Sequence, residues 1–152
     1  MSIIYKLKKN LAIVDEYITK YAGEIEECKD FFNFENKNLE YLCKKLPYYV
    51  FQFKSIQGEI KTIEGFLEFE KDKIEGTLFV KYTEKNQRVL GPKEIGMYIK
   101  QDPDYVTIME FILEISQIKY TIIGILDALE TYHWQLNNIV KIRVASLEET
   151  VL

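Results

Sequence analysis

Proline, glycine, cysteine and histidine are all scarce in this sequence of 152 residues. Three prolines and seven glycines leave few positions that break helices, which speaks against a chain made mainly of turns. The 29% of charged and 47% of hydrophobic residues are typical of a helix-rich globular protein. The length suits about one domain, so we expect residues 1–152 to form a single helical domain.

The two cysteines, Cys28 and Cys43, lack the spacing of a metal site. A disulfide between them is one interpretation, but two thiols without a signal peptide fit a reducing compartment better. The N-terminal residues lack the continuous apolar segment of a signal peptide, and no run of about eighteen apolar residues predicts a membrane span. We therefore expect a cytoplasmic protein with no membrane partner.

The single histidine, His133, has no catalytic partner at a recognisable spacing. A general base needs an orienting group and a nucleophile, so a pocket converging on His133 would be the structural sign of catalysis. Glu130 and His133 match one copy of the Glu-x-x-His motif of metal-binding bundles, but the second copy is absent. Gly91-Pro92-Lys93 lacks the spacing of a phosphate-binding loop. The sequence therefore predicts a protein that is not an enzyme and uses no metal or cofactor.

The helical periodicity of the sequence is strong. Apolar residues recur at alternating spacings of three and four in residues 3–32, 48–80 and 103–146, which predicts three long helices. A short helix is predicted at 93–100, and Pro47 predicts a kink or short break before the second long helix. The predicted fold is all-α, with long helices in a bundle or coiled-coil-like arrangement.

The chain divides into three parts by pattern. Residues 1–35 hold a heptad helix, and residues 36–90 hold a central helix and a basic loop. Residues 91–152 hold the short helix and the long C-terminal helix. The β-like residues at 79–83 predict that the central helix frays there, and we allow a short hairpin within 78–92.

The predicted C-terminal long helix has favourable residues at its N-terminus and carries a wide apolar face. Asp102-Pro103-Asp104 places a proline at the first helical position and acidic groups at the positive end of the helix. A single helix of some forty residues cannot bury such a face against itself, so it needs partner helices from its own chain or from other copies. We therefore predict a homo-oligomer that uses the end of this helix. The residues predicted at the interface are Leu136, Ile139, Val140, Arg143 and Val144.

The formal net charge of −4 does not suggest a nucleic-acid binder by itself. However, residues 36–100 carry twelve Lys and Arg against nine acidic residues. Single-stranded nucleic acid binds to cations along its backbone and to flat rings that stack on its bases. The candidate residues are Lys81, Lys85 and Arg88, with Tyr82 for stacking and Lys71 and Lys73 assisting. A solvated connection between helices, with Phe79 and Tyr82 packed inside, is the alternative interpretation, and both stay open.

The C-terminal part of the chain resembles a known family. It has a charged lead-in at Lys93–Lys100, an acidic helix start at Asp102-Pro103-Asp104 and a long apolar helix. The helix closes with aromatic, apolar, Lys/Asn, Ile and Arg positions between Leu126 and Arg143, and the charged helix that ends in an aromatic turn at Ile63–Thr83 also fits. Over roughly residues 45–145 this is similar to UvsY, the recombination mediator of T-even-like phages.

The resemblance implies an all-helical subunit that assembles into a ring. Such mediators bind single-stranded DNA and help to load a RecA-like recombinase against a single-strand-binding protein, and they are not enzymes. The alternative is a non-enzymatic helical interaction or structural protein, such as a virion or regulatory subunit, that does not bind DNA. A mediator should gather its basic residues on one surface, whereas the alternative should intersperse them with acids.

Overall fold

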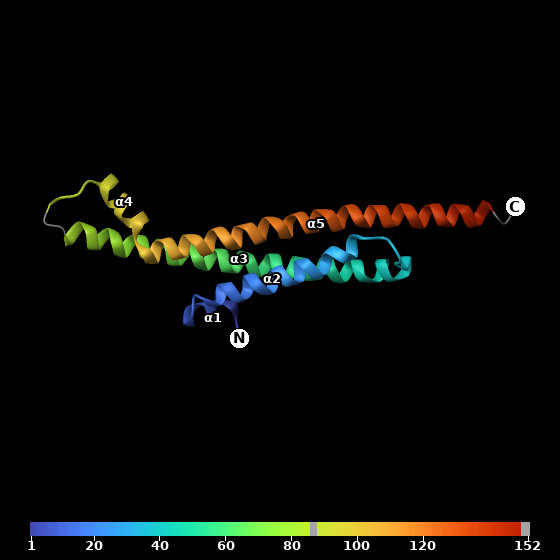
Figure 1. Ribbon diagram of the computed structural model, residues 1–152, viewed down its shortest axis with the longest axis horizontal. Coiled ribbons are helices and arrows are strands. Elements are labelled where there is room, and N and C mark those ends of the chain that lie inside the picture. The colour runs from blue at the N-terminus through green and yellow to red at the C-terminus, as the bar shows by residue number, and fades with distance from the viewer. Residues whose placement is uncertain (86–87, 150–152) are drawn as a thin grey trace. The chain divides into compact units, whose positions relative to one another are not determined.

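The structure is a computed structural model that describes residues 1–85 and 88–149, with side-chain surroundings up to residue 147. Every regular element in this described part of the chain is helical, as predicted, and it contains no strand (Figure 1). The elements are α1 (Ile3–Lys9), α2 (Ile13–Lys29), the short 3-10 helix η1 (Asp30–Phe32), α3 (Leu39–Glu84), α4 (Pro92–Gln101) and α5 (Pro103–Glu149). The prediction of an all-α fold with long helices is therefore confirmed.

The N-terminal helix is not continuous, and the prediction of one helix over 3–32 was wrong in this respect. Helix α1 ends at Lys9, and the backbone of Asn10 is extended. The Asn10 side chain accepts a hydrogen bond from the backbone N–H of Ala12 at 3.1 Å. Such a local bond offers the backbone an alternative to the helix, so the chain turns here before α2 begins.

Helix α3 is longer than predicted at both ends. It begins at Leu39 and passes through Pro47 without interruption, so the expected break was wrong. An interior proline costs a helix about 3 kcal/mol, but the neighbouring Leu42, Leu46 and Phe53 are all buried and supply packing that offsets this cost. The helix also extends to Glu84 without the predicted fraying at 79–83.

The chain forms two compact units that share three helices. The first unit comprises Met1–Ile18 and Glu59–Ile118, and the second comprises Thr19–Gly58 and Lys119–Leu152. Helices α2, α3 and α5 each run from one unit into the other. Because three helices belong to both units, this division does not test whether the chain is one domain, and the single domain stays a prediction.

The core of the first unit follows the predicted helical spacing. Its fully buried residues include Val14 of α2, Ile60 and Ile63 of α3, and Ile108 and Ile115 of α5. At the end of α3 a smaller cluster forms between α3 and α4, made of Leu78, Ile95 and Ile99. The partly buried side chains around this cluster are Ile74, Tyr82, Leu90 and Tyr105.

The core of the second unit continues the same stripes of α2, α3 and α5. The buried side chains are Tyr21, Cys28, Phe31, Leu42, Leu46, Phe53, Ile56, Ile122, Leu129, Tyr132 and Leu136. Loss of solvation on burial raises the pKa of the Cys28 thiol to about 11. Cys43 is exposed, and no disulfide joins the two cysteines.

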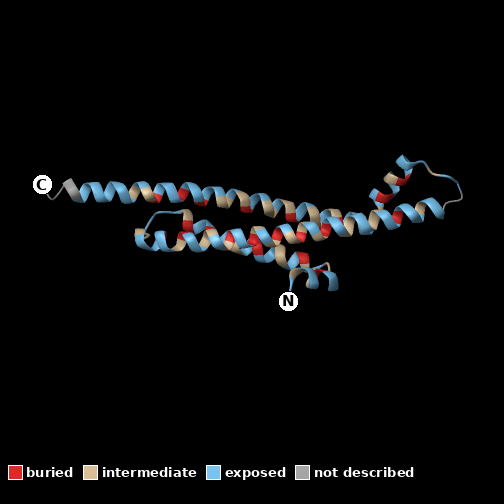
Figure 2. Ribbon diagram, turned by 180° about the vertical axis from the view of Figure 1, so that it is seen from behind, coloured by how far each residue is buried: buried red, intermediate tan, exposed pale blue. Residues whose placement is uncertain are grey.

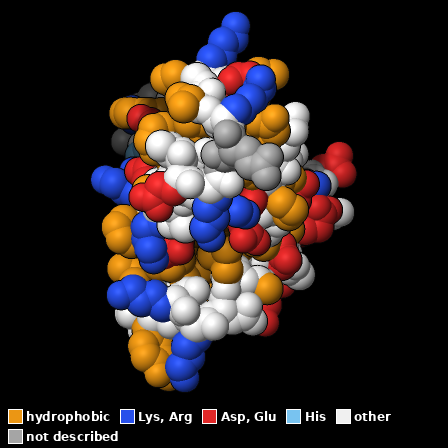
Figure 3. Space-filling view, turned by 90° about the vertical axis from the view of Figure 1, so that its left-hand side faces the viewer, with side chains coloured by type: hydrophobic (Ala, Val, Ile, Leu, Met, Phe, Trp, Pro, Cys, Tyr) orange, Lys and Arg blue, Asp and Glu red, His pale blue; other side chains and the backbone are white. Residues whose placement is uncertain are grey.

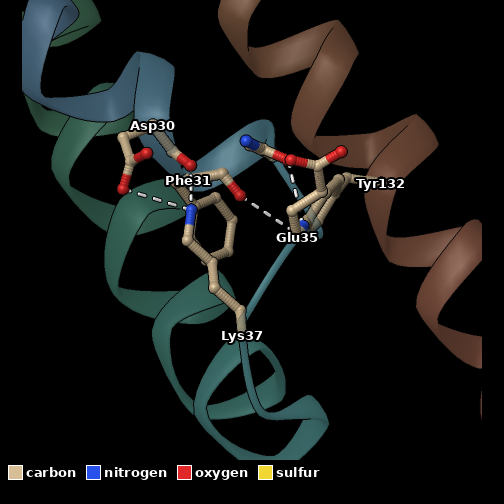
Figure 4. Close-up of polar contacts among 6 residues, drawn as sticks. Asp30, Phe31, Glu35, Lys37 and Tyr132 are labelled. Carbon is tan, nitrogen blue, oxygen red and sulfur yellow. Dashed lines mark hydrogen bonds and ion pairs between the residues drawn. The ribbon is translucent and has the colours of Figure 1, made fainter.

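An aromatic cluster attaches the α2–α3 connection to α5 in the second unit (Figure 4). The Tyr132 hydroxyl donates a hydrogen bond to the Phe31 carbonyl oxygen at 2.9 Å. The Tyr132 ring also lies 4.9 Å from the Phe31 ring and 4.7 Å from the Phe34 ring, measured between centroids. The Lys37 ammonium reaches back to the Asp30 carboxylate at 3.2 Å. These contacts cover α5 as far as Tyr132.

Candidate functional site

Helix α4 has a capped first turn and packs against the end of α3. Gly91 precedes Pro92 at the first helical position, and the Glu94 carboxylate accepts a hydrogen bond from the Gly91 N–H at 3.2 Å. The apolar face of α4 then packs on Leu78 of α3. This arrangement places the solvent-facing residues of α4 beside the last two turns of α3, where the candidate DNA-binding residues lie.

Two tyrosines stack on each other at this place. The rings of Tyr82 in α3 and Tyr98 in α4 are parallel to within 29°, with their centroids 5.5 Å apart. Tyr82 is half-buried against the Leu78 cluster, whereas Tyr98 is 45% exposed. Tyr98 was missed at the sequence level because Tyr82, on which it stacks, is sixteen residues away. Tyr82 is therefore packed, as the alternative interpretation predicted for it, and Tyr98 presents the more accessible ring.

Lys81 and Lys85 are exposed next to this pair. The Lys81 ammonium lies 5.7 Å from the centroid of the Tyr82 ring, within the range of a cation–π contact. Lys85 follows one turn later, at the end of α3. Neither ammonium has an ion-pair partner among the residues that the structure describes.

The other three candidate cations are paired with acidic side chains. Lys71 lies 2.8 Å from Glu68, and Lys73 lies 3.3 Å from Glu70. The Lys71 hydrogen bond to Glu68 raises the pKa of its ammonium group. An ion pair at 2.9 Å joins Arg88 to Glu94 of α4. On the face drawn in Figure 3, basic and acidic side chains are interspersed.

The structure thus brings together only part of the predicted nucleic-acid site. Lys81, Tyr82 and Lys85 lie close to one another, and Tyr98 joins them. Lys71 is ten residues before Lys81 on the same helix, which corresponds to about 15 Å along the helix axis. Residues 86–87, which lie between Lys85 and Arg88 in the predicted basic loop, are outside the described part of the chain.

The predicted subunit interface contains two kinds of residue. Leu136 is buried in its own unit, and Ile139 is half-buried. Beyond them the helix is almost wholly exposed (Figure 2): Val140 is 38% and Val144 49% accessible, and Arg143 is exposed. Ile142, which the sequence analysis did not select, is 66% exposed. The last turns of α5 therefore carry apolar side chains that their own unit does not cover.

The second unit also contains a cavity of about 400 Å³ between α3 and α5. Its apolar residues are Leu46, Val50, Leu126 and Leu129, and its polar residues include Lys54, Asp127, Glu130 and His133. The volume is within the range of about 300–1,000 Å³ that is usual for binding pockets.

His133 lies at this cavity but has no catalytic arrangement around it. No serine, threonine or cysteine lines the cavity, and the described residues contain no group of three potential metal ligands. The nearest polar contact of the imidazole is the Asn137 amide, one turn later, at 3.3 Å. The cavity therefore combines aliphatic walls with one lysine, two carboxylates and one imidazole.

In the residues described, we find no helix with the length and apolar character needed to cross a membrane. Comparisons with models of protein families, with curated proteins and with solved structures found no match for this chain. Its function must therefore be argued from its own residues.

Proposed function

We propose that this chain is a recombination mediator that assembles through the end of α5 and binds single-stranded DNA at the end of α3. In this role it is not an enzyme; it helps to load a RecA-like recombinase onto DNA that a single-strand-binding protein covers. The observation that carries the DNA-binding half is the pair of exposed lysines, Lys81 and Lys85, which form no ion pair with a described residue and lie beside the stacked Tyr82 and Tyr98. The sequence resemblance to the UvsY family supplies the recombination context.

The chemistry of this surface suits a single strand. Exposed ammonium groups pair with phosphates, and the accessible side of the Tyr98 ring offers a platform on which a base can stack without regard to sequence. Two cations on a chain of net charge −4 give one subunit little affinity. Repetition of the site around an oligomer raises the avidity by roughly two to four orders of magnitude, provided that the strand reaches several sites.

A helical interaction or structural protein without DNA binding is the second candidate. The observation that favours it is the pairing of Lys71, Lys73 and Arg88 with acidic side chains. An ion-paired cation has to leave its partner before it can neutralise a phosphate. The two candidates share the same fold and the same assembly, and they differ only in whether the end of α3 contacts DNA.

Fluorescence anisotropy with a labelled single-stranded oligonucleotide separates the two. The protein should be a verified oligomer by light scattering, and the titration should be repeated across salt concentrations. We expect binding that weakens with salt, by about 0.7 in log–log slope for each phosphate contacted. The double variant Lys81→Ala/Lys85→Ala should flatten this slope and leave assembly intact.

The matched control is Lys71→Ala/Lys73→Ala, which removes the same formal charge from the same helix. Because these two ammonium groups are already paired, the control should change the slope less than the first variant does. If the wild-type oligomer leaves the anisotropy unchanged at tens of micromolar and low salt, the DNA-binding half is wrong and the second candidate replaces it.

A further inference from the structure

The C-terminal part of α5 extends beyond the residues that bury the rest of the helix. We call residues 137–147 the α5 tail; within it every side chain from Val140 onward is exposed. As the end of a longer helix the tail has no nucleation cost, but its exposed apolar side chains gain burial energy when a neighbour covers them. Its own unit covers the tail only at its start, where Asn137 and Ile139 are half-buried.

The tail has one face with a definite chemistry. Val140 and Val144 are four residues apart and therefore lie on the same side of the helix. At about 100° per residue, Lys141 and Arg143 flank that side, and no acidic residue occurs within 137–147. Ile142 lies on the opposite side, because it is two residues from both valines. The tail therefore presents an aliphatic strip between two cations.

The cavity between α3 and α5 has the complementary chemistry. Its apolar residues include Val50 and Leu126, and its charged lining residues are the exposed Asp127 and Glu130, which outnumber the one exposed cation, Lys54. Phe51, which follows Val50 in α3, is 74% exposed, so large apolar surface continues beside the cavity. Apolar surface of this kind next to a hollow marks an interaction site.

The tail cannot reach the cavity of its own chain. Residues 126–133 line the cavity from α5, and the tail continues the same helix without a break. A continuous helix cannot bend back onto its own side over one or two turns. A second copy can supply the cavity that the tail cannot reach in its own chain, because every copy carries both the tail and the cavity.

We propose that the α5 tail of one copy docks into the α3–α5 cavity of a second copy. Val140 and Val144 then cover Val50 and Leu126, and the flanking cations lie near Asp127 and Glu130. This inference rests on the assembly half of the proposed function and specifies how that assembly forms. The contact is heterologous, because two different surfaces meet, so repetition closes a ring or extends a filament.

Two complementary variants test this arrangement. The tail variant Val140→Ser/Val144→Ser keeps an intact cavity, and the cavity variant Val50→Lys keeps an intact tail. Val50 is only half-buried, and circular dichroism at low concentration checks that each variant keeps its helix content. By light scattering at micromolar concentration, each variant alone should lose the wild-type oligomer.

An equimolar mixture of the two should form a 1:1 dimer and nothing larger. One intact tail meets one intact cavity in that dimer, while the remaining pair of surfaces is damaged on both sides. The control Ile142→Ser removes an equally exposed apolar side chain from the opposite face of the tail and should retain the wild-type oligomer. In the wild type, emission of the single tryptophan, Trp134, should shift to the red on dilution, because it adjoins the cavity residue His133 and loses its cover.

A mixture that remains monomeric, or single variants that keep the wild-type oligomer, would overturn this docking mode. In the second case the assembly half of the proposed function stands, because the oligomer then forms through another surface. A wild-type chain that is monomeric at micromolar concentration removes both. DNA binding through Lys81 and Lys85 is measured separately, by anisotropy, so its failure cannot be confused with either outcome.

Discussion

The two stretches of α5 on either side of Leu136 have similar apolar sequences but different surroundings. Before this point a buried residue recurs every seven positions, at Ile108, Ile115, Ile122, Leu129 and Leu136. After it the next position in the series is Arg143, and the exposed side chains include Val140, Ile142 and Val144. The difference lies in the neighbours: α2, α3 and their connection supply cover for the first stretch and end before the second. An apolar stripe in the sequence therefore indicates that a helix packs against a partner. Only the fold shows along which part of the helix its own chain supplies that partner.

The largest expected effect is that of a tail variant on the affinity for single-stranded DNA. The tail variant Val140→Ser/Val144→Ser leaves Lys81, Lys85 and the tyrosine pair unchanged. It should nevertheless lower the apparent affinity for a long single strand by roughly 10²–10⁴-fold, because separate subunits lose avidity. Anisotropy with a long and a short oligonucleotide measures this, and a strand that spans one site should bind both proteins equally. An unchanged affinity for the long strand would show that avidity does not come from this tail.

Shortening a side chain within the covered stretch of α5 should destabilise the fold, whereas shortening one in the α5 tail should not. Leu129→Ala removes a side chain with no solvent exposure and should lower the free energy of unfolding by about 2–5 kcal/mol. Val144→Ala should change it by less than about 0.5 kcal/mol when measured on dilute, dissociated protein. Urea denaturation followed by circular dichroism provides both values. Equal losses for the two variants would contradict the difference in cover.

The boundary of the covered stretch can be tested at Tyr132. Tyr132→Phe removes the hydroxyl that donates to the Phe31 carbonyl oxygen and leaves that acceptor without its partner. We expect a loss of about 1–3 kcal/mol in the free energy of unfolding. Tyr120→Phe, at a tyrosine that is 66% exposed on the same helix, is the matched control and should be nearly neutral. A neutral Tyr132→Phe would mean that the aromatic cluster does not hold the α2–α3 connection to α5.

The pH dependence of stability reports on the covered side of the second unit. Burial raises the pKa of Cys28 from 9.0 to about 11, so the folded chain keeps the thiol proton where the unfolded chain has lost it. The free energy of unfolding should thus fall as pH rises from about 9 to 11, by at most about 1.4 kcal/mol per pH unit, and this group should contribute no slope below that window. Cys28→Ala should reduce the slope, and Cys43→Ala should not. The comparison is made by urea denaturation at several pH values, and equal slopes in all three proteins would show that Cys28 is not desolvated.

Much of this fold was predictable because helix faces are encoded locally. The three-four spacing identified Leu129 and the other core positions of α5 before any neighbour was known. The continuation of α3 through Pro47 was not predictable, since it depends on packing against residues distant in sequence. The turn at Asn10 depends on one side-chain bond that competes with the helix.

The candidate site was less accessible to prediction than the fold. Lys81, Tyr82 and Lys85 are close in sequence and stay close in space, so a local pattern found them. Tyr98 comes to Tyr82 only because α4 packs on Leu78. The pairing of Arg88 with Glu94 likewise depends on how the connection turns into α4. The spacing of residues in the sequence predicts neither the Tyr82–Tyr98 contact nor the Arg88–Glu94 contact.

Amide hydrogen exchange of residues 140–147, measured at protein concentrations above and below the assembly threshold, tests most directly whether a second copy covers the α5 tail. We predict that these amides become strongly protected as concentration rises, while the amides around Leu129 are protected at every concentration. If residues 140–147 exchange at the same fast rate in concentrated protein as in dilute protein, the tail is not an interface and the proposed assembly is wrong.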